Sequence, residues 1–89
     1  MRSRTTRQFR QRLKTLPDAI QRQVKTAYQR FEANPWDQSL RFKQVHPSQP
    51  IYSVRITKGY RAIGKRDTKG MLWFWVGSHA DYEHVLGRR

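Results

Sequence analysis

The sequence predicts an α+β fold in which an N-terminal helical hairpin packs on an antiparallel β-meander, followed by a short C-terminal helix. Two observations carry this prediction. Apolar residues recur at helical spacing over residues 7–33, whereas from Ser39 onward they alternate with polar residues, as in half-buried strands. Turn signals at Lys58-Gly59 and at residues 67–70 divide the second part into strands joined by tight turns. Because 89 residues are the size of one domain, we expect a single domain over residues 1–89.

Two helices are expected before the sheet. The first covers residues 7–16, with Thr6 as a plausible N-cap, and Pro17 ends it because proline restricts the residue before it. The second runs from Asp18 to Ala33, with one apolar stripe and an opposite face of Gln and basic residues. Asn34-Pro35 ends this helix. The two helices would form the layer that covers the sheet.

The remaining elements are short strands and one last helix. The expected strands are Leu40–Lys43, Ile51–Thr57, Tyr60–Lys65 and Met71–Val76. Ser78 is the expected N-cap of a final helix over His79–Leu86, and Gly87 is its stop signal.

The hairpin through Lys58-Gly59 admits two registers. A three-residue loop over residues 57–59, with Gly59 in the left-handed region, pairs Ile56 with Tyr60 and places Arg55 opposite Arg61. A two-residue turn would instead put the two arginines on opposite faces of the sheet. The sequence leaves both registers open, but the three-residue loop separates polar from apolar side chains more cleanly. That register gathers Ser53, Arg55, Arg61, Ile63 and Lys65 on one cationic face.

Net charge is the strongest functional signal in the composition. Nineteen Lys and Arg against six Asp and Glu give a formal net charge of +13, and the excess lies in residues 1–30 and 51–70. Self-repulsion of this size costs stability, so we expect a polyanion to be bound, and RNA is the polyanion that we favour. An acidic protein partner would be attracted by the same field.

Other features of the sequence exclude several classes of protein. There is no cysteine, hence no disulfide, no thiolate nucleophile and no zinc–thiolate site. No apolar run approaches the roughly 20 residues of a membrane span, and the first residues lack the apolar stretch of a secretory signal. We therefore expect a cytoplasmic protein without a membrane partner.

Basic residues on the predicted sheet are the candidate binding groups. Like charges directly opposite on a sheet are destabilising, so the pair Arg55 and Arg61 suggests that an anion lies between them. Guanidinium groups match phosphate oxygens bidentately. Lys43, Lys58 and Lys65 are expected to extend the RNA-binding surface, although solvated edge lysines that prevent aggregation would look the same.

A histidine at the start of the last helix is the candidate for proton transfer. Next to the arginine pair and Tyr82, His79 is a credible general acid or base near neutral pH. His46 and His84 are weaker candidates. The three histidines do not show metal-ligand spacing with carboxylates, so we predict no metal and no cofactor.

Four segments together resemble the RelE/ParE toxin superfamily, on its RelE-like side. They are Leu40-Arg41-Phe42-Lys43, Tyr52-Ser53-Val54-Arg55, Gly59-Tyr60-Arg61-Ala62, and residues 73–79 followed by Tyr82. The resemblance implies a small toxin neutralised by a cognate antitoxin. For the RelE branch it also implies an endoribonuclease (an mRNA interferase) that cuts messenger RNA bound in the ribosome, without a metal. The ribose 2′-hydroxyl attacks the adjacent phosphate and leaves a 2′,3′-cyclic phosphate.

The resemblance also implies a role for each candidate catalytic residue. Arg61 matches the arginine of the family's Gly-Tyr-Arg segment, which would hold the scissile phosphate, and Arg55 could stabilise the phosphorane. His79 would be the general acid or base, and Tyr82 lies near the usual site of a C-terminal tyrosine. Ser53 stands where some members have a catalytic lysine, so the base that activates the 2′-hydroxyl is not evident.

Two other functions remain open at this point. A ParE-like member of the same fold would poison DNA gyrase with no nuclease chemistry, although a gyrase binder needs no proton-transfer group. A catalytically silent RNA-binding or interaction module would also fit the substitution at Ser53.

Overall fold

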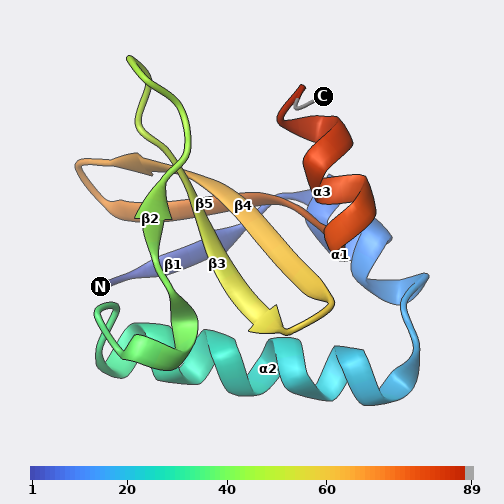
Figure 1. The fold of residues 1–89 in the computed structure, drawn as a ribbon. Coiled ribbons are helices and arrows are strands. Elements are labelled where there is room, and N and C mark those ends of the chain that lie inside the picture. The colour runs from blue at the N-terminus through green and yellow to red at the C-terminus, as the bar shows by residue number, and fades with distance from the viewer. Residues whose placement is uncertain (88–89) are drawn as a thin grey trace.

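The computed structural model describes residues 1–87 and shows the α+β architecture that the sequence predicts (Figure 1). The elements in chain order are β1 (Ser3–Thr5), α1 (Arg7–Lys14), α2 (Asp18–Ala33), a 3₁₀ turn η1 (Gln38–Leu40), β2 (Lys43–Gln44), β3 (Ile51–Thr57), β4 (Tyr60–Asp67), β5 (Gly70–Ser78) and α3 (His79–Val85). The strand order in the sheet is β1-β5-β4-β3-β2. The helices α1 and α2 pack mainly on β5 and β3 respectively, which confirms the predicted fold class.

The sheet is mixed rather than purely antiparallel, because it includes β1, a strand that the sequence did not predict. Strands β2 to β5 form the expected meander, but β1 pairs with β5 in parallel. Side chains secure this three-residue strand. The Trp73 indole N–H donates to Ser3 Oγ at 3.2 Å, and Arg4 binds both carboxylate oxygens of Asp67 at 2.6 and 2.8 Å. The hydrogen bond from Arg4 is the main reason why the pKa of Asp67 lies below its ordinary value.

The segment before β3 also differs from the prediction. The strand expected over Leu40–Lys43 is displaced to Lys43–Gln44, and Gln38–Leu40 form a 3₁₀ turn capped by the Asp37 carboxylate. The chain leaves this turn through Arg41, which has φ 47° and ψ 45°. A non-glycine residue in the left-handed region costs roughly 1–2 kcal/mol, and it interrupts the extended backbone that a strand requires.

The register between β3 and β4 combines the two alternatives considered from the sequence. Arg55 lies opposite Arg61, as the three-residue loop predicted, but the predicted pairing of Ile56 with Tyr60 is wrong. Thr57 pairs with Tyr60 around a two-residue turn, and Ile56 is the extra residue of a β-bulge. Gly59 does not adopt a positive φ. The bulge therefore returns both arginines to one face although the turn is short.

The sheet buries a cluster of side chains on each face. On the face covered by α1 and α2, Phe31 packs edge-to-face on both Phe42 and Trp73, with ring centroids 4.9 and 5.3 Å apart. On the other face, Ile63 and Trp75 pack with Tyr82 of α3. At a second bulge, Phe74 of β5 is the extra residue opposite the step from Ile63 to Gly64, so Trp73 and Trp75 enter different clusters. The candidate site lies on the face that α3 covers.

The close packing at Gly64 gives a stability test. A Cβ at this position would lie 2.6 Å from the Trp73 ring, 2.9 Å from Met71 Cε and 3.0 Å from the Leu72 carbonyl oxygen. Because β5 leaves no space, we expect Gly64→Ala to lower the free energy of unfolding by about 1–3 kcal/mol in urea denaturation.

Gly59→Ala is the matched control, since a Cβ there has no heavy atom within 4 Å. We expect it to change the free energy of unfolding by less than about 0.5 kcal/mol. Equal effects of the two substitutions would contradict the described packing of β4 on β5.

Candidate active site

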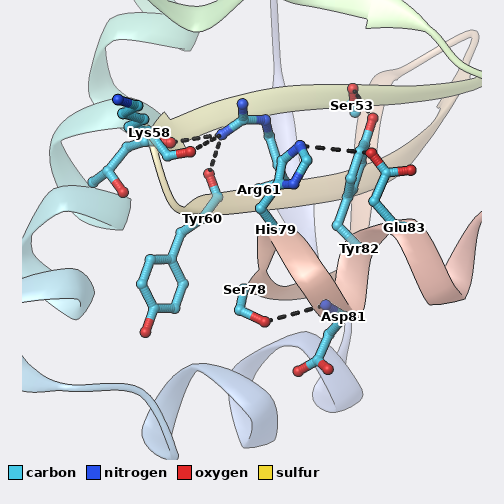
Figure 2. Close-up of polar contacts among 10 residues, drawn as sticks. Ser53, Lys58, Tyr60, Arg61, Ser78, His79, Asp81, Tyr82 and Glu83 are labelled. Carbon is cyan, nitrogen blue, oxygen red and sulfur yellow. Dashed lines mark hydrogen bonds and ion pairs between the residues drawn. The ribbon is translucent and has the colours of Figure 1, made fainter.

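A hollow on the α3 side of the sheet collects most of the polar residues singled out in the sequence. It has a volume of about 130 Å³ and is lined by Arg41, Lys43, Ser53, Arg55, Arg61, His79, Tyr82 and Glu83. Strands β3 and β4 form its floor, α3 forms one wall, and the segment leading into β2 forms the other. Figure 2 shows how Arg61, His79, Tyr82 and Glu83 approach one another there.

The floor of the hollow holds two arginines on adjacent strands. Arg55 and Arg61 are directly opposed in the β3–β4 register. Arg61 Nη1 donates to the carbonyl oxygens of Thr57, Tyr60 and Lys58 at 2.6, 3.0 and 3.3 Å, which fixes the guanidinium at the hairpin turn (Figure 2). Burial, and after it the charge of Arg55, lowers the pKa of Arg61. An anion between the two groups would relieve this repulsion, and two guanidinium groups can hold a phosphate by paired hydrogen bonds.

The N-terminus of α3 places an imidazole at the edge of the hollow. Ser78 Oγ accepts from the Asp81 N–H at 3.2 Å as the N-cap, and the His79 N–H donates to the Gly59 carbonyl at 2.8 Å. The start of α3 is therefore tied to the hairpin that carries Arg61. His79 Nε2 lies 3.6 Å from Glu83 Oε1, one helical turn later, and its side chain is 46% exposed. The imidazole therefore stands beside a carboxylate at the edge of the hollow and is accessible to a bound substrate.

Tyr82 lies in the hollow but is engaged in packing. Its side chain is buried between α3 and the sheet, and its hydroxyl donates to Ser53 Oγ at 3.1 Å. Ser53 is only 2% exposed. The tyrosine therefore docks α3 on β3, and the Ser53 hydroxyl is already used in that contact.

The structure divides the remaining predicted RNA-binding residues. Lys43 lines the hollow, whereas Lys58 contributes its backbone carbonyl to Arg61 and is not among the lining side chains. Lys65 is exposed at the opposite end of β4, where it pairs with Ile51 and Leu72. His46 accepts backbone N–H groups of its own loop, outside the hollow.

Sequence reasoning missed two residues that line the hollow. Arg41 reaches it because the left-handed backbone at that position turns the chain, and no sequence pattern marked that conformation. Glu83 could have been found, since it follows His79 by four residues on a predicted helix, the spacing at which side chains meet.

The described residues contain neither a cluster of metal ligands nor a helix that could span a membrane. Over residues 1–87, no group of three or more His, Cys, Asp and Glu side chains is arranged to hold a metal ion. Within the same part of the chain, none of the helices has both the length and the apolar character needed to cross a membrane.

Comparison with solved structures supports the fold assignment. A chain of the RelB–RelE antitoxin–toxin complex from Methanococcus jannaschii matches with a TM-score of 0.75 and 16% identity, over 92% of this chain and 96% of that chain. YafQ from E. coli strain BL21(DE3) matches with a TM-score of 0.72 and 15% identity, over 91% and 96%. A chain of the archaeal RelE–RelB complex from Pyrococcus horikoshii OT3 gives 0.65 and 18%, over 86% and 92%. No curated protein sequence matches.

These similarities show that the chain has the fold of the solved RelE and YafQ chains, with two N-terminal helices on a five-stranded sheet. At the level of sequence, residues 18–84 match the family model described as the ParE-like toxin domain. The chain belongs to this family.

The contact between Tyr82 and Ser53 can be tested by a double-mutant cycle. We expect Tyr82→Phe and Ser53→Ala each to lower the free energy of unfolding by about 1–2 kcal/mol, because each leaves one buried hydroxyl or acceptor without its partner. The double variant should cost less than the sum of the two, with a coupling energy of about 1 kcal/mol in urea denaturation. Additive effects would mean that the hydrogen bond does not hold α3 on the sheet.

Proposed function

We propose that this toxin is a metal-independent endoribonuclease that cuts messenger RNA on the ribosome. The observation that carries the proposal is the arginine pair in the hollow, with an imidazole beside it. Arg55 and Arg61 face each other, and His79 is fixed to the same hairpin by its backbone. Arg61 also holds the hairpin turn through three backbone carbonyls, but a phosphate in the hollow would use both arginines and the imidazole together.

The proposed reaction is a transesterification within the RNA. The 2′-oxygen forms a bond to the adjacent phosphorus, the bond from phosphorus to the 5′-oxygen of the next nucleotide breaks, and the products end in a 2′,3′-cyclic phosphate and a 5′-hydroxyl. Arg61 would hold the scissile phosphate, and Arg55 would stabilise the additional negative charge of the phosphorane. Electrostatic stabilisation by groups that are already in place is the main contribution that the hollow can make to catalysis.

Position 53 is a serine, so a lysine at this position cannot transfer a proton in the proposed reaction. We assign removal of the 2′-hydroxyl proton to His79, because its imidazole lines the hollow, with the Glu83 carboxylate 3.6 Å away. Lys43, on the opposite wall of the hollow, is placed to donate a proton to the leaving 5′-oxygen. Tyr82 serves as a positioning residue, since its buried hydroxyl is bonded to Ser53.

A cognate antitoxin is the protein partner that we propose. Two of the similar structures are described as antitoxin–toxin complexes of RelB and RelE. A net charge of +13 favours an acidic partner, and a segment that covers the hollow would neutralise the arginine pair. We place both the toxin and its antitoxin in the cytoplasm, where ribosomes and messenger RNA are found.

Gyrase poisoning is the second candidate, and the name of the matching family favours it. Residues 18–84 match the family model described as the ParE-like toxin domain. Such a toxin would leave messenger RNA intact and cause cleaved DNA to accumulate.

The nuclease proposal is tested by primer extension on a reporter messenger RNA after controlled expression. We expect wild-type protein to give discrete cuts that disappear when translation is blocked. His79→Ala should reduce cleavage by about 100-fold or more, the usual contribution of a general base. Arg61→Ala should reduce it at least tenfold, because charge-assisted contacts contribute about 1.5–3 kcal/mol.

Two exposed residues provide matched controls. His84→Ala alters the other histidine of α3, and Arg22→Ala alters an exposed arginine of α2; neither residue lines the hollow. Both variants should cut like wild type. If all four variants cleave equally, the hollow is not the active site, and growth arrest without cuts in messenger RNA would favour gyrase as the target.

A further inference from the structure

A second hollow lies next to the candidate active site, between α2 and the end of β3. Figure 1 shows α2 running past the end of β3. The hollow has a volume of about 540 Å³ and lies between these elements and the turn η1. It shares two lining residues, Arg41 and Arg55, with the first hollow. The two hollows therefore meet at the edge of β3, where β2 pairs only with Tyr52 and Ser53.

The chemistry of this second hollow suits a polyanion. Three arginines line it, Arg30, Arg41 and Arg55, and none of its lining residues in the described part of the chain is acidic. The Asp37 carboxylate, next in sequence to the lining residue Gln38, interacts electrostatically with Arg30 and accepts hydrogen bonds from the N–H and hydroxyl of Ser39 at 2.9 and 2.7 Å. The charge of the hollow is therefore only partly compensated by the protein.

The polar groups of the lining suit a nucleotide better than a peptide. Gln23 and Gln38 offer amides that both donate and accept hydrogen bonds. Of the three apolar lining residues, Leu40 and Ala27 are covered, at 2% and 7% exposed, and Ile56 is half-buried. A peptide that depends on apolar anchors would find only the Ile56 side chain partly exposed here, whereas phosphates and base edges would find several donors.

The length of the combined surface also favours an oligonucleotide. Ser53 lines the first hollow and Thr57 lines the second, four residues further along β3, which is about 13 Å at the rise of a strand. One phosphate does not fill such a length. Arg41 stands at the junction in its left-handed conformation, and backbone strain of this kind is characteristic of functional sites.

We propose that the second hollow is a subsite for the phosphate next to the scissile phosphate of a single-stranded RNA and for the nucleotide beyond that phosphate, which a dinucleotide lacks. Arg41 and Arg55 would bridge the scissile phosphate and its neighbour, Arg30 would pair with the neighbouring phosphate, and Gln23 and Gln38 would hydrogen-bond the nucleotide. This inference rests on the proposed nuclease function, because it takes the first hollow as the place of the scissile phosphate.

The test compares RNA of two lengths that cannot be cleaved. Fully 2′-O-methylated ribonucleotides of two and five residues lack the attacking hydroxyl, and their affinities can be measured by fluorescence anisotropy and competition. Gln23→Glu should weaken the pentanucleotide about fivefold through repulsion of its phosphate and leave the dinucleotide unchanged. Gln29→Glu is the matched control, since it changes the same charge on an exposed glutamine of α2 that does not line the hollow.

Salt dependence gives a second readout. For single strands the slope of log affinity against log salt concentration changes by about 0.7 for each phosphate contact. Arg30→Gln should therefore reduce the magnitude of this slope by about 0.7 for the pentanucleotide and leave that of the dinucleotide as in wild type.

Failure of the subsite can be distinguished from failure of the nuclease proposal. If Gln23→Glu binds the pentanucleotide like Gln29→Glu, the subsite is overturned; loss of affinity for an acidic antitoxin in the same variant would then assign the hollow to a protein. Arg61→Ala should weaken both oligonucleotides. If Arg61→Ala binds both normally while Gln23→Glu weakens the longer one, the hollow binds RNA but the first hollow is not the site of cleavage.

Discussion

The pairing of β3 with β4 is the constraint on which both the core and the site depend. Because side chains alternate between the faces of a strand, a shift of one residue would exchange the two faces. In the observed register Val54 and Ala62 enter the core beneath α1 and α2, while Arg55 and Arg61 face α3. The bulge at Ile56 makes this register compatible with a two-residue turn. One extra residue in β3 thus decides where the cations lie.

The site is assembled at some cost to the free protein. Two arginines are opposed, one of them has its pKa lowered by burial, and Arg41 adopts a left-handed backbone conformation. Buried contacts around the site offset these costs. Tyr82 holds α3 on Ser53, and the first N–H of α3 is bonded to the hairpin turn. An anion that binds in the hollow would stabilise the protein as well as react, which agrees with a chain that carries a net charge of +13.

The sequence was sufficient for the features that depend on local pattern. The periods of apolar residues predicted both N-terminal helices, the main strands and α3, and the charge and residue types pointed to Arg55, Arg61 and His79 as one constellation. The structure brings these three together with Tyr82 and Lys43. Their chemical roles remain predictions.

What the sequence could not reveal depends on contacts between distant segments. Strand β1 is only three residues long, and it is held by Trp73 and Asp67, which lie more than 60 residues away. The turn at Arg41 has no glycine or asparagine to mark its left-handed conformation. Lys65 appeared equivalent to Lys43 in the alternation pattern, yet only Lys43, which pairs with Ser53, lines the hollow. Lys65 pairs with Ile51, two residues further from the arginine pair, because alternation fixes the face of a residue and not its position along the strand.

The chemistry of the cut ends tests the central claim most directly. Messenger RNA fragments from a translation reaction containing the purified toxin can be isolated and their termini identified by mass spectrometry. Attack by the 2′-hydroxyl in the arginine-lined hollow predicts a 2′,3′-cyclic phosphate on the upstream fragment and a 5′-hydroxyl on the downstream fragment. Fragments that end in a 3′-hydroxyl and a 5′-phosphate, or uncut messenger RNA at a toxin concentration that arrests translation, would contradict it.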